Sequence, residues 1–155
     1  MLKATILKPN MVSPGNDYNV NGRSLRENAM ATIDVLCDHV PVSVPGIMFL
    51  SGGMCEEEAT RNLNEINKVW KEQLDRTRMG RSPWTISFSF GRALQTSAVK
   101  AWKGRDENVE RGQSAFLIRC KANSEAQLGV YNGWALTEED AKVMRQKGYV
   151  LRSKM

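Results

Sequence analysis

The sequence alternates short apolar segments with stretches that repeat apolar residues at helical spacing, in the order strand, helix, strand, helix, strand, helix. The apolar segments cover residues 4–8, 46–51 and 84–90, and their carboxyl ends recur roughly 40 residues apart. Alternation of this kind is typical of parallel strands joined by right-handed helical crossovers. No sequence repeat accompanies the spacing, so it indicates repeated architecture alone. We therefore expect an α/β fold with further helices after the third unit.

The helices between these strands carry start signals in the sequence. Ser24 with Glu27 three residues later is a capping-box pattern, which predicts a helix from about residue 25. Glu56, Glu57 and Glu58 precede an apolar stripe, and carboxylates in a first turn favour the positive end of the helix dipole. We interpret these three acids as helix-stabilising residues and not as a catalytic cluster. Three further helices are predicted, over residues 92–103, from 106 towards 131, and over a short surface stretch whose start is marked by Thr137 with Asp140 and whose end is marked by Gly148.

Composition limits the function classes. The 155 residues, 41% of them hydrophobic, suffice for one sizeable core. No run approaches the ~18 apolar residues of a membrane span, so no membrane partner is expected. No signal pattern opens the chain, which favours a cytoplasmic location, with a plastid as the alternative if a transit peptide precedes Met1. The net charge of +5 would suit a polyanion, but the basic residues are scattered without interleaved aromatics, so no nucleic-acid partner is expected.

The three cysteines give no metal or disulfide pattern. Cys37, Cys55 and Cys120 are too widely spaced for a zinc site, and their odd number argues against a closed disulfide framework. We expect free thiols and no bound metal or other cofactor.

Polar residues and glycines lie at the carboxyl end of each of the three predicted strands. They are Lys8 at the first, Ser51, Gly52 and Gly53 at the second, and Ser89, Gly91 and Arg92 at the third. In parallel α/β folds the functional groups gather at the carboxyl ends of the strands. We therefore expect all seven residues to face one common rim.

Lys8 can be read in two ways. At a rigid strand end, partly removed from water and near other cations, a lysine can attack a carbonyl carbon as the neutral amine and form a Schiff base. A lysine at a strand end can also simply extend its ammonium group into solvent, which is the commoner case. The segment ATILKPNMV around Lys8 does not by itself decide between the two.

The other rim residues suit a phosphate group. Ser51, Gly52 and Gly53 directly precede a predicted helix, whose N–H groups and dipole can hold an anion, although the same residues also suit an ordinary glycine turn. Arg92 can grip phosphate with two parallel hydrogen bonds, and Gly91 lets a ligand approach the backbone. A cation at a helix start opposes the dipole unless an anion is bound, so Arg92 favours phosphate binding. In β/α barrels such sites often follow strands 7 and 8.

Four long segments of the chain are collinear with the motifs of a known family. They are TILKPNMVSPG, GIMFLSGGMCEEEATRNLNEINK, PWTISFSFGRALQTSAVKAWKG and ENVERGQSAFLIRCKANSEAQLGVY. From residue 2 to about Tyr131 they resemble the C-terminal part of class I fructose-bisphosphate aldolase. The resemblance implies an eight-stranded β/α barrel, usually a homotetramer. It also implies cleavage of fructose 1,6-bisphosphate to dihydroxyacetone phosphate and glyceraldehyde 3-phosphate in glycolysis and gluconeogenesis, without a metal or other cofactor.

The resemblance also implies a role for each rim residue. Lys8 matches the Schiff-base lysine of the family's LLKPNMV motif, and it would condense with the C2 ketone of the sugar. The protonated imine would then be the electron sink for breaking the C3–C4 bond. The substrate phosphate would be held by the residues that match the family's SGG and GR motifs and the adjoining strand, namely Ser51, Gly52, Gly53, Ser89, Gly91 and Arg92.

The chain also departs from the family pattern. Three βα units are part of an eight-unit barrel, which typically takes ~250 residues. We expect residues 1–131 to form the last three βα units of a TIM (β/α)8 barrel with C-terminal helices, and 132–155 a variable tail. The family's acid–base residues fall outside this chain. Residues 69–82 look longer than the family's connection and predict a polar surface insertion, and Tyr149 is a candidate counterpart of the family's C-terminal tyrosine.

Two functions follow from these expectations. The first is an aldolase, a carbon–carbon lyase that acts on a phosphorylated sugar. The second is an inactive aldolase fragment that acts only as a phosphate-binding or interaction module, because an incomplete barrel exposes two unpaired sheet edges.

Overall fold

The computed structural model describes residues 1–15, 24–77 and 82–151 of the chain. Within them, a parallel sheet is formed by β1 (Ile6–Leu7), β2 (Gly46–Phe49) and β3 (Thr85–Phe88), in the order β1-β2-β3. A short 3-10 helix, η1 (Leu2–Ala4), precedes β1. The predicted α/β fold with parallel strands is confirmed, although each strand is shorter than its apolar segment.

Each connection between two neighbouring strands contains a helix, and further helices follow β3. The helices are α1 (Leu25–His39), α2 (Glu56–Thr77), α3 (Arg92–Trp102), α4 (Val109–Gln127) and α5 (Glu138–Gln146), with a 3-10 turn η2 (Asp106–Asn108) before α4. The predicted cap at Ser24 is present, because its side chain accepts a hydrogen bond from the Glu27 N–H. Among the described residues, no helix is both long and apolar enough to span a bilayer.

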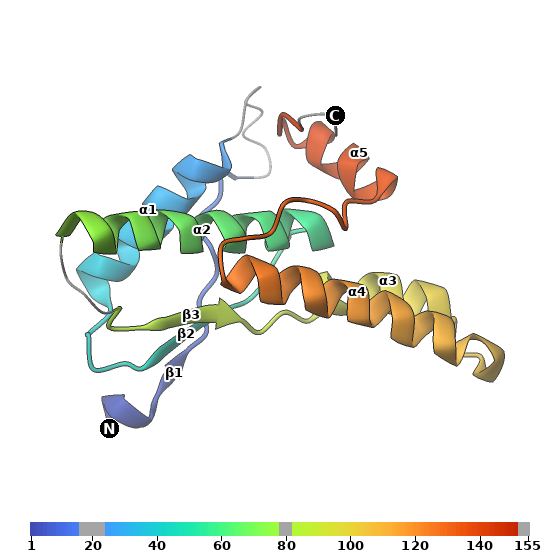
Figure 1. Ribbon diagram of the computed structural model, residues 1–155, viewed down its shortest axis with the longest axis horizontal. Coiled ribbons are helices and arrows are strands. Elements are labelled where there is room, and N and C mark those ends of the chain that lie inside the picture. Colours follow the sequence, from blue (N-terminus) through green and yellow to red (C-terminus); the bar gives the residue numbers. More distant parts are fainter. Residues whose placement is uncertain (16–23, 78–81, 152–155) are drawn as a thin grey trace.

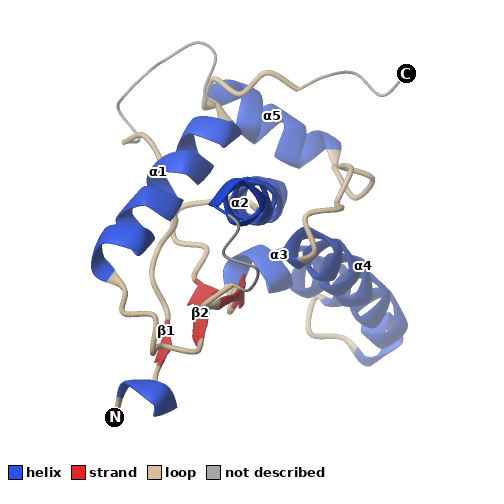
Figure 2. Ribbon diagram, turned by 60° about the vertical axis from the view of Figure 1, so that its left-hand side comes forward, coloured by secondary structure: helices blue, strands red, loops and turns tan. Residues whose placement is uncertain are grey.

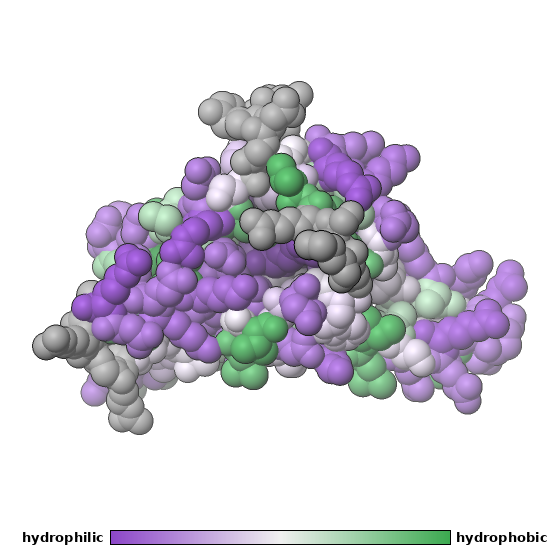
Figure 3. All heavy atoms as spheres, turned by 45° about the horizontal axis from the view of Figure 1, so that its top comes forward, coloured by the Kyte–Doolittle hydropathy of each residue, from purple (hydrophilic) through white to green (hydrophobic). Residues whose placement is uncertain are grey.

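Helix α2 lies at the centre of the molecule. Figure 2 looks nearly along its axis, and α1, α5, α4 and the sheet surround it. Leu63 and Ile66 of α2 and Ile47 and Phe49 of β2 are all 0% exposed, so the apolar stripe of α2 and one face of the sheet build a shared core. On the face shown in Figure 3, hydrophilic residues predominate and hydrophobic ones form separate patches. The apolar core of the described residues therefore lies around α2.

The β1 strand lies at the edge of the sheet, with β2 as its neighbour (Figure 1). Ile6 is 62% exposed and Leu7 is 36% exposed, although both are apolar. On the other side of β1 the described residues supply no strand, as expected for an unpaired edge.

The prediction of a polar surface insertion over residues 69–82 is wrong for its first part. Val69 and Trp70 are buried, and the Trp70 ring stacks on Trp84 with centroids 5.4 Å apart. The helix α2 continues to Thr77, because its apolar stripe extends through these residues to Leu74, which packs against the core. Residues 78–81 lie outside the described part of the chain.

Candidate functional site

The segments that follow the three strands run side by side. The Leu50 N–H donates to the Pro9 carbonyl oxygen at 3.0 Å, and the Ser89 N–H donates to the Phe49 carbonyl oxygen at 2.8 Å. Main-chain pairing therefore continues beyond the ends of β1 and β3. The predicted rim residues therefore lie at or just after the carboxyl ends of the three strands, on one end of the sheet, as parallel strands require.

Lys8 lies at the carboxyl end of β1 and is exposed. It follows Leu7, which pairs with Ile47, and Ile47 pairs with Ile86, so the pleat directs Lys8 to the opposite face of the sheet from these apolar residues. Among the described residues, no hydrogen bond or ion pair involves the Lys8 side chain. The partly dehydrated environment expected for a nucleophile is not formed here, because β1 is an edge strand.

The Ser51–Gly52–Gly53 segment forms a tight turn before α2. The Ser51 carbonyl oxygen accepts a 3.1 Å hydrogen bond from the Met54 N–H, and Gly53 has φ +75, a conformation that favours glycine. Within the described part of the chain, the N–H groups of Gly52 and Gly53 have no hydrogen-bond acceptor. Two free N–H groups beside a helix N-terminus form an arrangement that can bind an anion.

A cavity of about 230 Å³ lies against this turn. Its walls come from the loop after β1, the turn, the start of α2 and the end of α5. They include Asn10, Ser13, Gly52, Gly53, Glu58 and Lys147. Of these residues, Asn10, Glu58 and Lys147 were not predicted from the sequence as site residues. Asn10 stands in the same KPN motif as Lys8, which is a usable signal, whereas Lys147 has no local signal because it lies 94 residues from Gly53.

Arg92 lies in a neighbouring cavity of about 180 Å³, between the start of α2, α3 and α5. Met54 lines both cavities, so Arg92 and the glycine turn lie on either side of it. Gly91 is the N-cap of α3, and Arg92 is its first residue. Ser89 is exposed and lines neither cavity, while Ser87 is buried and donates a 2.6 Å hydrogen bond to Gln127 Oε1.

The acids of the first α2 turn do more than interact with the helix dipole. Their predicted position is confirmed, but all three are buried. Glu56 Oε1 accepts hydrogen bonds from the N–H and the hydroxyl of Ser97, at 3.0 and 3.1 Å. Glu58 Oε2 accepts a 2.6 Å hydrogen bond from Lys147 Nζ. These contacts tie the start of α2 to α3 and to the end of α5.

Glu57 is the centre of a buried polar cluster. It is 0% exposed, accepts hydrogen bonds of 2.7 Å from Arg61 Nε and from the Tyr131 hydroxyl, and lies 3.6 Å from Arg119 Nη2. Arg119 also donates to the Ala135 carbonyl oxygen at 2.9 Å. Burial and the charge of Glu57 raise the pKa of Tyr131. The cluster joins α2 to α4 and to the segment after α4.

The three cysteines are free. Burial, with the nearby charges of Asp140 and Glu58, raises the pKa of the Cys55 thiol to about 12. This thiol is therefore a poor nucleophile, although it lies beside a helix N-terminus. Within residues 1–15, 24–77 and 82–151, no group of three or more His, Cys, Asp or Glu is arranged to hold a metal ion.

Tyr149 is buried next to α1. Its hydroxyl accepts a 3.3 Å hydrogen bond from Asn28 Nδ2, and burial, followed by the charge of Glu58, raises its pKa. Its correspondence to a C-terminal tyrosine of the family remains a prediction.

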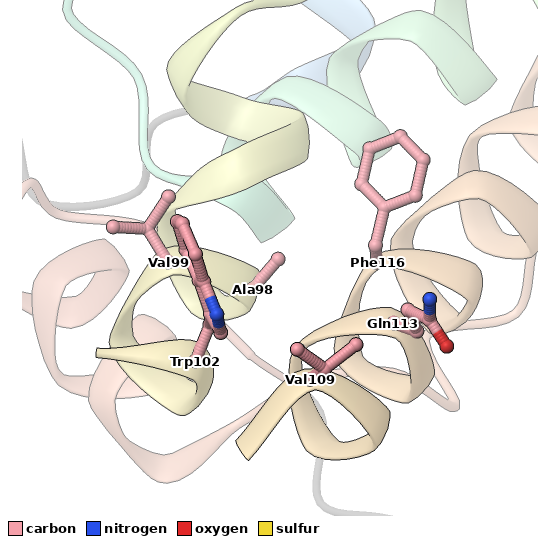
Figure 4. Close-up of a pocket in the computed structure, with 7 residues that line it drawn as sticks. Ala98, Val99, Trp102, Val109, Gln113 and Phe116 are labelled. Atoms are coloured by element: carbon pink, nitrogen blue, oxygen red, sulfur yellow. The ribbon is translucent and has the colours of Figure 1, made fainter. Parts of the chain in front are cut away.

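A larger apolar groove of about 360 Å³ lies away from these residues, between α3 and α4 (Figure 4). It is lined by Ala98, Val99, Trp102, Val109, Gly112, Gln113 and Phe116. None of the predicted site residues lines it.

Comparisons with known proteins agree on one family. The family model described as fructose-bisphosphate aldolase class-I matches residues 1–151. The chain is 47% identical over 158 residues to cytosolic fructose-bisphosphate aldolase 6 of Arabidopsis thaliana, covering 96% of this chain and 39% of that protein. It is 52% identical over 134 residues to the cytoplasmic isozyme of Cicer arietinum, covering 86% of this chain and 34% of that protein.

A solved structure is also similar. It is the fructose-bisphosphate aldolase of Plasmodium falciparum in complex with TRAP and a small-molecule inhibitor, with a TM-score of 0.74 and 40% sequence identity. The match covers 85% of this chain and 35% of that chain. The chain thus spans well under half the length of the relatives it matches.

Proposed function

Since the chain belongs to the class I fructose-bisphosphate aldolase family, we propose that it carries the Schiff-base lysine and the phosphate site of such an enzyme. The substrate is fructose 1,6-bisphosphate, cleaved to dihydroxyacetone phosphate and glyceraldehyde 3-phosphate. The observation that carries the proposal is the common rim at which Lys8, the Ser51–Gly53 turn and Gly91–Arg92 follow adjacent parallel strands. The names of the relatives favour an enzyme over an inactive interaction module.

The described elements are the last three βα units of an eight-unit barrel, formed by residues 1–131, and residues 132–155 are a C-terminal tail. Two observations support this assignment. The chain covers 39% and 34% of two relatives, and β1 leaves one edge unpaired and apolar. In the complete barrel another strand pairs with that edge and encloses Lys8 on the inner face of the sheet.

In this mechanism Lys8 attacks the C2 carbonyl carbon of the sugar and forms an imine with loss of water. The protonated imine then accepts the electron pair released when the C3–C4 bond breaks. In the complete barrel, the N–H groups of Gly52 and Gly53 hold the phosphate on C1 together with Ser51, Ser89, Gly91 and Arg92, the other residues that match the family's phosphate motifs. Binding at this remote group orients C2 towards Lys8, so binding energy is used to lower the barrier. The acid–base residues belong to the part of the family that this chain does not span.

The location and assembly follow the relatives. The two plant relatives are named cytosolic and cytoplasmic, and we assign the same location to this protein. The complete protein is a homotetramer, and no nucleic-acid partner is part of the proposal.

The test is borohydride trapping with dihydroxyacetone phosphate, followed by peptide mass mapping. It is run on the 155-residue chain and on this chain joined to the preceding part of the Cicer arietinum isozyme. The expected result is a reduced adduct on Lys8 in the joined protein, lost in Lys8→Met and retained in the matched control Lys3→Met, which removes another exposed lysine of the same segment.

An adduct on a different lysine would contradict the role of Lys8. An adduct in the joined protein alone would assign the activity to the whole enzyme, and its absence from both proteins would favour a phosphate-binding or interaction module.

A further inference from the structure

Lys147 connects the C-terminal helix to the glycine turn. Its Nζ donates a 2.8 Å hydrogen bond to the Gly53 carbonyl oxygen and a 2.6 Å hydrogen bond to Glu58 Oε2. The side chain of Lys147 is 24% exposed and that of Glu58 is 2% exposed, so the ion pair is largely removed from water. An ammonium group from the tail thus contacts the turn that the proposed function assigns to phosphate.

The position of Lys147 is set by how α5 ends. Gly148 has φ +87, and the Tyr149 N–H returns to the Met144 carbonyl oxygen at 3.0 Å, which closes the helix directly after Lys147. On either side, Met144 (0% exposed) and Tyr149 (4% exposed) are buried anchors. Figure 1 shows α5 beside the N-terminal end of α2. Lys147 is therefore held at the turn by buried contacts on both sides of it in sequence.

Two effects on the turn follow from these contacts. The carbonyl group of Gly53 and the N–H of Met54 belong to one peptide group, and both ends are bonded, the first to Lys147 and the second to Ser51. Lys147 therefore restrains the orientation of the peptide that follows the two free N–H groups. It also neutralises Glu58, whose negative charge in the first turn of α2 would otherwise repel a phosphate.

We propose that Lys147 is a positioning residue of the phosphate site, which restrains the Gly53 peptide and compensates the charge of Glu58, so that docking of the tail helix strengthens phosphate binding. This inference rests on the proposed function of the Ser51–Gly53 turn. The cation comes from residues 132–155, outside the four segments that carry the family resemblance.

The test titrates inorganic phosphate into the 155-residue chain and follows the amide signals of Gly52 and Gly53 by NMR. Lys147→Met is expected to weaken phosphate binding about tenfold, which corresponds to a loss of about 1.4 kcal/mol of binding free energy. Lys147→Arg, which keeps the charge and the donors, is expected to restore most of the affinity. The matched control is Lys142→Met, an exposed lysine on the same helix, which is expected to leave the affinity unchanged.

A second substitution separates this role from mere packing of the tail. In the Lys147→Met background, Glu58→Gln removes the uncompensated charge and is expected to recover part of the phosphate affinity, which a packing defect would not. Hydrogen exchange without phosphate should show faster exchange in residues 51–58 of Lys147→Met than of Lys142→Met.

The outcomes distinguish the inference from the proposed function. If the unmodified chain binds no phosphate, the assignment of the turn fails and the role of Lys147 fails with it. If the unmodified chain and Lys147→Met bind phosphate equally, or if Glu58→Gln recovers nothing, only the inference about Lys147 is overturned.

Discussion

The Tyr131 hydroxyl donates a 2.7 Å hydrogen bond to Oε2 of Glu57, a residue 74 positions earlier in the chain, and the contact is buried. It ties the first turn of α2 to the segment after α4. Arg119, 2% exposed, lies 3.6 Å from the same carboxylate oxygen. The start of α2, on which the proposed phosphate site depends, is therefore anchored by a charged group inside the core.

Glu57→Gln is expected to lower the free energy of unfolding by about 3–5 kcal/mol, because it leaves the Arg119 guanidinium buried without a counter-charge. The double variant with Arg119→Met should lose less than the sum of the two single losses, since both charges are then gone. Urea unfolding followed by circular dichroism measures the free energy of unfolding of each single variant and of the double variant. The matched control is Glu72→Gln, which breaks an exposed ion pair between α2 and Arg26 and should change little. Equal losses for Glu57→Gln and Glu72→Gln would contradict the role of the cluster.

Tyr131→Phe is expected to change how stability depends on pH. The pKa of Tyr131 is raised in the folded chain from its ordinary value of 10.0 by burial and by Glu57. The stability that this raised pKa contributes is fully present below about pH 10 and is lost as pH rises further, because the unfolded chain then releases the proton more readily. Thermal unfolding at pH values above about 10 should show a smaller loss for Tyr131→Phe than for the unmodified chain. Parallel curves for the two proteins would count against a raised pKa at Tyr131.

Gly112→Ala is expected to loosen the contact between α3 and α4. A Cβ at this position would lie 2.9 Å from the Cβ of Trp102 and 3.5 Å from the Ala98 carbonyl oxygen, so the helices must separate. The strain, about 1–3 kcal/mol, outweighs the gain in helix propensity of about 1 kcal/mol. A lower midpoint in thermal unfolding is the expected result. Ser114→Ala, an exposed change on the same helix, should not lower it, and a stabilised Gly112→Ala would disprove the close packing.

Cys55 is expected to resist alkylation while the chain is folded. Burial raises its pKa from 9.0 to about 12, so its thiolate fraction near pH 8 falls roughly a hundredfold or more. Labelling with iodoacetamide in buffer and in concentrated urea, followed by peptide mass mapping, gives the two rates. The exposed Cys37 should be labelled before Cys55 in buffer, because the reagent reaches its sulfur directly. The idea fails if Cys55 reacts equally fast in buffer and in urea.

Local signals predicted most of the fold. The capping pattern of Ser24 and Glu27 correctly marked the start of α1, and Thr137 with Asp140 marked the start of α5, where the Thr137 hydroxyl accepts from the Asp140 N–H. Such signals work because capping involves residues only three positions apart. Val69 and Trp70 were mispredicted as part of a polar surface insertion, because the comparison of loop lengths outweighed the apolar stripe that continues through these two residues.

The sequence predicted where in the fold the site residues lie, but not what surrounds them. The sequence indicated that Lys8 and the glycine turn come at adjacent strand ends, as parallel pairing requires. It left open whether Lys8 is enclosed or exposed, because that depends on the strands that accompany β1, and in this structure Lys8 is exposed.

By itself, the sequence determined the order of the elements, their caps and the family, because each depends on neighbouring residues or on collinear motifs. The tertiary structure alone decided that Glu57 meets Tyr131 and that Lys147 meets Gly53 across 94 residues. Contacts of this kind arise only when helices far apart in the chain pack against each other, and they need no local pattern in the residues that make them.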